Sequence, residues 1–495
     1  MEIRFSIEIN GNTDIFIIGT EVSNNIQLKS STNFPEVEEE LSKEVSNKIQ
    51  LKFQSSSEII RNFPEVEKEL SNIVIALFVY EALLKDGNYN NKGASKVQQK
   101  LKGNEKIKIQ LENLDKNKAS KLGIAIQGIL SFCLDVCPDV IVESNYSYDI
   151  NSLKKHTFSN KSVGLFSGGA DSFAGFSVLS NKFSINEYVF VSHGSTQLQI
   201  LLMAKLKPIF DNKNLELVYF NVSKGRSEGV QQLRGLLYMT IGSLYARTIN
   251  SNKLVVAETG PTMIQPPYDI LDEVTLTTHP FVIRMVEELY KLYFDEKLTI
   301  QTPFKDMTKA EALSLVNKDN ISINYIKKTN SCRNTMFANS TYSHCGKCLG
   351  CIVRRISMIL SDFELPEEDY YAWNVFVMDI NEKVYGRGKN VHMHFKDLSN
   401  IIMLGESSRN ILLNKWDDIS SIKIKEQGKE NLFKRFALDF FTVLYLLYDK
   451  NKIGRNEYLK QFYIQCKKEG IINENIANGR LNDIANNSYL KINEN

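Results

Sequence analysis

The stretch Val163-Gly164-Leu165-Phe166-Ser167-Gly168-Gly169-Ala170-Asp171-Ser172 indicates both a fold and a chemistry. Its first four residues are apolar or glycine, which is typical of a buried strand, and a helical pattern follows. The paired glycines let backbone N–H groups approach an anion, and the helix N-terminus adds partial positive charge. Ser167 and Ser172 add hydroxyl donors, and Asp171 is placed to hold Mg²⁺. We predict a phosphate-binding loop; the alternative is an ordinary strand–turn–helix corner.

The residues around this stretch alternate between short apolar runs and amphipathic segments. The runs predict strands at 162–166, 188–191, 215–221, 253–257 and 298–301. Helices are predicted between them, notably at 198–210, 233–250 and 281–294. Such alternation is typical of an α/β fold with a parallel, doubly wound sheet. Ligands of these sheets bind beyond the carboxyl ends of the strands, where the loop lies.

The string Ser-Gly-Gly-x-Asp-Ser resembles the loop of the N-type ATP pyrophosphatases. These include GMP, asparagine and NAD synthetases, tRNA thiolases and the QueC enzymes. The resemblance implies a HUP-like core that cleaves ATP between its α and β phosphates and transfers AMP to a substrate oxygen. The loop is not a Walker loop, because no Gly-Lys-Ser/Thr follows it.

Four of the seven cysteines fall within residues 332–351. They are Cys332, Cys345, Cys348 and Cys351, with the spacing C-x12-C-x2-C-x2-C. Four thiolates can close a tetrahedral shell around a structural Zn²⁺. An iron–sulfur cluster and a chance grouping of core cysteines are the alternatives. We predict a zinc site.

Together, the loop and the cysteines resemble QueC, the 7-cyano-7-deazaguanine synthase family, over roughly residues 162–355. The element Thr302-Pro303-Phe304 followed by Thr308-Lys309-Ala310-Glu311 is also similar to that family. The resemblance implies that Lys309 faces the nucleotide phosphates and acts with Asp171 as a catalytic residue; a solvent-facing lysine is the alternative. It also implies ATP, Mg²⁺ and Zn²⁺ as cofactors. QueC enzymes adenylate 7-carboxy-7-deazaguanine, form its amide with ammonia and then dehydrate the amide to the nitrile.

The sequence departs from the QueC pattern outside these motifs. The loop lies past residue 160, and Ser192-His193-Gly194-Ser195 replaces the family's Tyr-Gly-Gln-Arg-His. Gln265-Pro266-Pro267-Tyr268-Asp269 and Thr277-Thr278-His279-Pro280 replace its Tyr-Pro-Asp-Cys-Arg. Long forms of the family are encoded in bacterial antiphage systems, Qat and the QueC-bearing type of CBASS. That likeness implies an ATP-dependent C–N ligase whose acceptor is ammonia or an amine of a partner protein.

Six further residues are candidates for contacting the substrate. Glu258, Thr259 and Gly260 follow the predicted strand 253–257 at the carboxyl edge of the sheet. The other three are His193, Arg234 and His279. Each histidine is otherwise a polar residue meeting a local hydrogen bond, and Arg234 is otherwise a surface residue.

Three segments are expected. Residues 1–155 form an α+β extension with an N-terminal hairpin and helices at 63–84 and 119–132; residues 156–362 form the ATP pyrophosphatase domain. Residues 363–495 form a small, mostly helical domain, with helices at 431–448 and 455–469 and no visible chemistry. The terminal segments are expected to recognise a protein acceptor, or to complete the fold or a homodimer. Removal of residues 1–150, or of the region after Asp362, is expected to spare acid-dependent ATP cleavage and to abolish transfer to a protein.

Composition narrows the class of partner. The formal net charge is +2 and 24% of residues are charged, which gives no strong nucleic-acid signal. No stretch is apolar enough to span a membrane, and the first residues read as a strand, so we expect a cytoplasmic protein. Two other functions remain open. A tRNA thiolase needs a basic surface and redox cysteines, and a non-catalytic nucleotide sensor need not keep Asp171 and Lys309.

Overall fold

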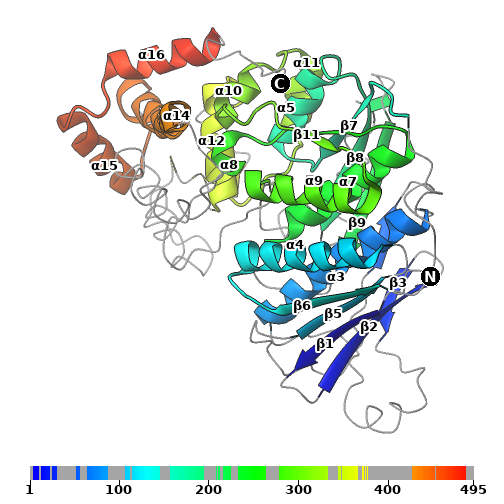
Figure 1. Cartoon of the computed structure of the whole chain (residues 1–495). Helices are drawn as coiled ribbons and strands as arrows, with labels where there is room; N and C mark the ends of the chain where they lie inside the picture. The colour runs from blue at the N-terminus through cyan, green and yellow to red at the C-terminus, as the bar shows by residue number, and fades with distance from the viewer. Residues whose placement is uncertain are drawn as a thin grey trace. The chain divides into compact units, whose positions relative to one another are not determined.

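The computed structural model describes the helices and strands of most of the chain (Figure 1), which divides into two compact units. The described residues are 4–9, 13–22, 25–29, 52–55, 64–86, 106–111, 114–144, 157–193, 208, 210–211, 216–223, 232–263, 278–332, 344–346, 348–365, 371–372, 374, 376, 426–451 and 453–486. The first unit comprises Met1–Ser167, Phe183–Val256 and Val274–Gln301. The second comprises Gly168–Lys182, Ala257–Glu273 and Thr302–Asn495.

A six-stranded sheet of the first unit has the order β11-β10-β7-β8-β9-β4. Five strands are parallel: β7 (Ser162–Phe166), β8 (Ile185–His193), β9 (Glu216–Ser223), β10 (Lys253–Val256) and β11 (Thr299–Gln301). The edge strand β4 (Lys52–Ser55) is antiparallel to β9. Counted along the chain from β7, the parallel order is 5-4-1-2-3, so the direction of winding reverses between β7 and β10. Doubly wound sheets bind ligands beyond the carboxyl ends of the strands at this switch point.

A second sheet is built from N-terminal strands in the order β3-β2-β1-β5-β6. Strands β1 (Arg4–Ile9) and β2 (Thr13–Val22) form the predicted hairpin, in which Ile9 pairs with Thr13. The others are β3 (Asn25–Lys29), β5 (Lys106–Leu111) and β6 (Asp139–Ser144). Strands β5 and β6 are parallel, with the helix α4 (Lys116–Leu134) between them in sequence and packed on β6.

The helix α7 (Arg234–Thr248) is buried on all sides, from Gly235 to Arg247. Such a helix is mostly apolar because it is covered on every face. Strands β7, β8 and β10 cover one side, and the helices α3 (Glu65–Asp86) and α9 (Pro280–Phe294) pack on it as well. The N-terminal helix α3 is therefore a layer of the α/β core.

Buried charges fasten α3 to that core. Arg247 pairs with Glu67 of α3, and its Nε lies 2.9 Å from Glu296 Oε2. Glu81 Oε2 accepts a hydrogen bond of 2.9 Å from Leu233 N, at the first turn of α7. These contacts argue against the expectation that residues 1–150 are dispensable, because their loss would remove one of the two carboxylates that pair with Arg247 and would leave the Leu233 N–H without its acceptor.

The described part of the second unit is helical. Helices α5 (Ala170–Leu179), α8 (Gly260–Met263), α10 (Lys309–Ser314), α11 (Asn320–Ile326) and α12 (Leu349–Leu360) come from its first part. The C-terminal part adds α14 (Glu426–Tyr445), the π-helix η3 (Leu446–Lys450), α15 (Glu457–Lys468) and α16 (Glu474–Ala485). Apolar side chains of α12, α14, α15 and α16 share one core, which includes Ile356, Phe440 and Leu444.

The predicted α/β class and the parallel sheet are confirmed: all five predicted strands are present, shifted by at most three residues at either end. Most of the predicted helix 198–210 lies outside the described residues. Both units draw on more than one predicted segment, and the boundaries at 155/156 and 362/363 stay predictions. Within the described chain, no helix combines the length and hydrophobicity needed to cross a membrane.

Candidate active site

The predicted phosphate loop leaves the carboxyl end of β7 and enters α5. Gly168 has φ of 78°, in the left-handed region that favours glycine. Gly169 is the N-cap of α5, and it has no side chain to cap the first N–H groups of the helix. The Ser172 hydroxyl donates to the Gly169 carbonyl at 2.9 Å. A helix start whose N–H groups lack a side-chain acceptor is suited to binding an anion.

The structure joins the two residues predicted to be catalytic. Asp171 Oδ2 lies 2.9 Å from Lys309 Nζ, the first residue of α10, and both side chains are about nine-tenths buried. The other oxygen, Asp171 Oδ1, is buried and has no hydrogen-bond partner among the described residues. An unpartnered, ionised oxygen is the kind of ligand that Mg²⁺ prefers. The donor set at Asp171 therefore fits a magnesium ion.

The segment that follows β10 is held against the turn before Lys309. Gly260 N donates to the carbonyls of Phe304 (3.2 Å) and Met307 (3.1 Å). A Cβ on Gly260 would lie 2.1 Å from the Lys305 carbonyl oxygen, so only glycine fits. Of the predicted substrate residues here, Thr259 is fully buried, with its hydroxyl 3.2 Å from that of Thr262, and Glu258 is half-buried.

The four predicted metal ligands come together. The Sγ atoms of Cys332, Cys345, Cys348 and Cys351 all lie within 4.8 Å of one another. A Zn–S length of about 2.3 Å separates two tetrahedral ligands by about 3.8 Å. The separation between the Sγ atoms of Cys345 and Cys351 is 3.8 Å. A set this compact is compatible with one tetrahedral zinc ion.

Local geometry shapes the cysteine site. Gly346 has φ of 78°, which turns the chain between Cys345 and Cys348. A hydrogen bond from Cys332 lowers the pKa of Cys348, which favours the thiolate form of this side chain. Thiolates are the species that bind metal, and a cation relieves the repulsion among them.

The cysteine site also contacts the phosphate loop through one residue. Asn330 N donates to the Gly168 carbonyl at 2.9 Å, and Asn330 Oδ1 accepts from Cys332 N at 2.8 Å. The side chain and the backbone of Asn330 thus connect a metal ligand to the glycine turn of the loop.

The other three predicted substrate residues belong to the first unit. His193 ends β8, and its side chain is outside the described atoms. Arg234 begins α7 and is half-buried. His279 is buried and is the N-cap of α9: its Nδ1 accepts from Phe281 N at 3.1 Å, and its ring centroid is 5.2 Å from that of Phe132. This capping bond is the local hydrogen bond that the alternative to a substrate-binding role predicts for His279.

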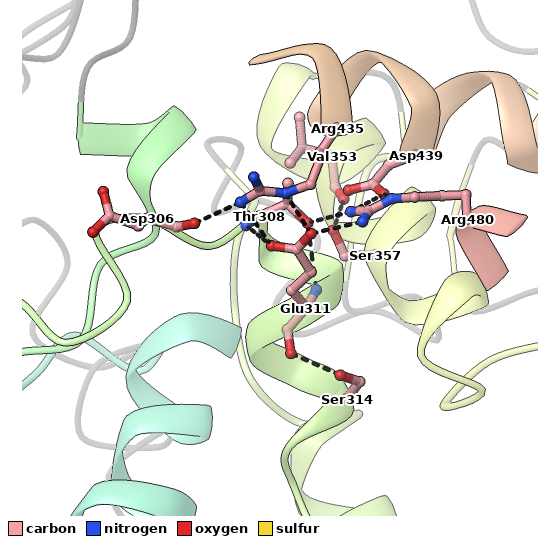
Figure 2. Close-up of polar contacts among 9 residues, drawn as sticks. All are labelled: Asp306, Thr308, Glu311, Ser314, Val353, Ser357, Arg435, Asp439 and Arg480. Carbon is pink, nitrogen blue, oxygen red and sulfur yellow. Dashed lines mark hydrogen bonds and ion pairs between the residues drawn. The ribbon is translucent and has the colours of Figure 1, made fainter. Parts of the chain in front are cut away.

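Sequence reasoning missed two arginines of the C-terminal helices. Arg435 and Arg480 lie against Thr308 and Glu311, on either side of Lys309 in the sequence (Figure 2). The expectation that the C-terminal segment carries no chemistry did not foresee these contacts. No local pattern distinguishes such residues, because arginines on amphipathic helices usually lie at the surface.

A parallel α/β sheet, a glycine-rich loop after its first parallel strand and a group of four cysteines are the features that the resemblance to the ATP pyrophosphatases implies. Residues 231–360 match the family model of Queuosine biosynthesis protein QueC. This stretch, about a quarter of the chain, contains Lys309 and the four cysteines but not the loop. No curated protein matches the chain. The chain thus contains a QueC-like region, and the loop before it is an independent indication of the same chemistry.

Proposed function

We propose that this protein is an ATP-dependent C–N ligase that adenylates the carboxylate of a 7-deazaguanine acid and transfers the acyl group to an amine. The observation that carries the proposal is the ion pair between Asp171 and Lys309. Asp171 lies in the loop, outside the QueC match, and Lys309 lies inside it. This single contact therefore joins a residue of the loop to a residue of the QueC-like region, and the two regions indicate the same chemistry independently.

The reaction has two balanced steps. A carboxylate oxygen of the acid attacks the α-phosphorus of ATP, and pyrophosphate leaves, which gives an acyl adenylate. An amine then attacks the acyl carbon, AMP leaves with the C–O electron pair, and the amine loses a proton. The loop N–H groups and Lys309 would hold the departing pyrophosphate, and Asp171 Oδ1 would bind a magnesium ion that neutralises phosphate charge.

The Cys₄ site has a structural role in this proposal. A closed set of four thiolates leaves no open position for substrate. Its contact with the loop through Asn330 lets it support the pyrophosphate site without taking part in the reaction.

The proposed acceptor is an amine of a partner protein, as the likeness to long antiphage forms suggests; the competing acceptor is ammonia. The motifs that depart from QueC lie at His193 and at residues 265–280, while the loop, Lys309 and the cysteines are kept. Changes in these motifs beside an intact loop favour retained ATP chemistry with altered handling of substrate or acceptor.

The test is incubation with ATP, Mg²⁺ and 7-carboxy-7-deazaguanine, followed by mass spectrometry of small molecules and of co-expressed proteins from the native operon. We expect AMP and pyrophosphate only when the acid is present. An adduct on a protein would support the protein acceptor, and free amide or nitrile formed with ammonia would replace it. ATP binding without cleavage would instead support the nucleotide sensor and refute the ligase.

A further inference from the structure

The start of α10 carries a capping box that is buried. Thr308 Oγ1 accepts from Glu311 N at 3.4 Å, and Thr308 N donates to Glu311 Oε2 at 2.9 Å. Such boxes usually face solvent, but Glu311 is only 4% exposed. A carboxylate at this depth needs compensating positive charge.

Arg435 of α14 supplies part of that charge. Its Nε donates to Glu311 Oε1 at 2.8 Å, and its Nη2 donates to the Asp306 carbonyl at 2.6 Å. One guanidinium therefore holds the chain both before and after Lys309. Three residues earlier on α14, Leu432 packs close to Gly260.

Arg480 of α16 completes the enclosure (Figure 2). Its Nη1 lies 2.7 Å from Glu311 Oε1, its Nη2 donates to Thr308 Oγ1 at 3.3 Å, and its Nε donates to Asp439 Oδ1 at 2.7 Å. Arg435, Arg480, Glu311 and Asp439 are all buried, and their formal charges cancel.

The opposite side of α10 faces the loop. Residues two apart on a helix differ by about 200° in direction. Glu311 points to the arginines, and Lys309 Nζ reaches Asp171 Oδ2. The first turn of α10 is thus fixed by guanidinium groups on one side and by the loop carboxylate on the other.

We propose that Arg435 and Arg480 are positioning residues that set the place of Lys309 at the pyrophosphate loop. The importance of this positioning for catalysis rests on the proposed function. In this proposal the C-terminal helices affect the reaction by holding the backbone of residues 306–311 in place, and their arginines do not contact the substrate. The competing explanation is that the same cluster only fastens the C-terminal helices.

Both explanations predict lost stability, so the test needs another readout. In the full-length protein without nucleotide, the Lys309 amine would be acetylated with acetic anhydride and its labelling rate followed by mass spectrometry. We expect Arg435→Met and Arg480→Met to raise that rate by about tenfold, the scale of one lost charged hydrogen bond. Arg247→Met is the matched control, since it breaks a buried ion pair in the first unit.

Turnover supplies the second readout. For acid-dependent AMP formation we expect the two methionine variants to lower kcat by at least about tenfold, because misplaced groups act mainly on the reacting complex. Arg435→Lys and Arg480→Lys keep the charge but lack the forked donors, and should fall between wild type and the methionine variants. These lysine variants also serve if a methionine variant does not fold.

Different results would overturn the positioning role and the proposed function. Folded Arg435 and Arg480 variants with the Lys309 labelling rate and kcat of Arg247→Met would overturn the positioning role. Wild-type protein that forms no AMP from the acid would overturn the proposed function alone, because the labelling experiment needs no substrate.

Discussion

The backbone N–H of Asn330 lies 2.9 Å from the carbonyl oxygen of Gly168, so the cysteine site and the phosphate loop share a hydrogen bond. Gly168 has a positive φ, and its carbonyl direction depends on that conformation. Asn330 in turn accepts from Cys332 N. One asparagine therefore connects the cysteine site to the loop through hydrogen bonds.

Replacing Asn330 with alanine should weaken ATP binding. The change removes the acceptor of Cys332 N, which releases the segment that holds Gly168. We expect KM for ATP to rise by about tenfold, as for one lost hydrogen bond near a buried group. Steady-state AMP formation measures it. Asn252→Ala is the control, because that side chain donates to the Lys297 carbonyl at an exposed turn of the first unit. An unchanged KM would show that the loop does not depend on this link.

Metal removal should lower both stability and turnover. Elemental analysis should find one zinc per chain, because the four Sγ atoms fit one tetrahedral ion. Cys348→Ser or treatment with a strong chelator should lower the urea midpoint and speed hydrogen exchange in the loop at 167–173, since metal binding contributes folding free energy. Stoichiometric iron, or metal-free protein of wild-type stability, would contradict the zinc assignment.

Variants of the Asp171–Lys309 pair should affect AMP formation and stability differently. Asp171→Asn leaves Lys309 buried without its counter-charge, and Lys309→Met leaves Asp171 alone; each should cost about 3 kcal/mol or more. The double variant should recover much of that stability, because neither charge remains. AMP formation should stay at least about 100-fold below wild type in all three. Recovered activity in the double variant would remove the pair from the mechanism.

The N-terminal helix α3 should be essential for folding. Glu81→Ala leaves the Gln232 and Leu233 N–H groups without their acceptor, at a cost of about 1–3 kcal/mol. Urea unfolding would measure this cost, with the exposed Glu143→Ala as the control. A chain that lacks residues 1–150 should not fold. If it were folded and active, the N-terminal layer would be an accessory.

Asp439 should give stability a distinct pH dependence. Burial, partly offset by Arg480, raises the pKa of Asp439 from 3.8 to about 6. Between these values the folded protein keeps a proton that the unfolded chain has lost. The resulting stabilisation is full below the unfolded pKa and is lost as pH rises through about 6. Relative to Asp439→Asn, the wild type should therefore lose up to about 1.4 kcal/mol per pH unit over that window. If the free energies of unfolding of the two proteins, measured with urea, differed by the same amount at every pH, the raised pKa of Asp439 would be contradicted.

The sequence predicts those parts of the fold whose signals are local. The run Ser162–Phe166 is apolar, and it is the strand β7 to the residue. The cysteines have short spacings, and their thiols meet. Lys106–Leu111 alternates apolar and polar residues, which is a local strand signal, and it forms β5.

Contacts between distant charged residues leave no such signal. Arg480 lies in a helix of low amphipathicity, and its partner Thr308 is 172 residues earlier. Likewise, nothing near Glu81 in the sequence shows that it caps α7. The contact between the loop and Lys309 and the grouping of the four cysteines could therefore be predicted, whereas the side chains that hold α10 and α7 in place could not.

The separation between Thr308 and Arg480 also affects how the protein is made. Chains are synthesised at about 5–20 residues per second, so 172 residues correspond to on the order of 10 to 30 s of translation. During that interval the loop and Lys309 already exist, but the arginines that enclose Glu311 do not. If Arg435 and Arg480 have the proposed positioning role, a nascent chain, or one that ends before Arg480, would therefore lack the groups that fix α10 beside the loop until α16 has been added.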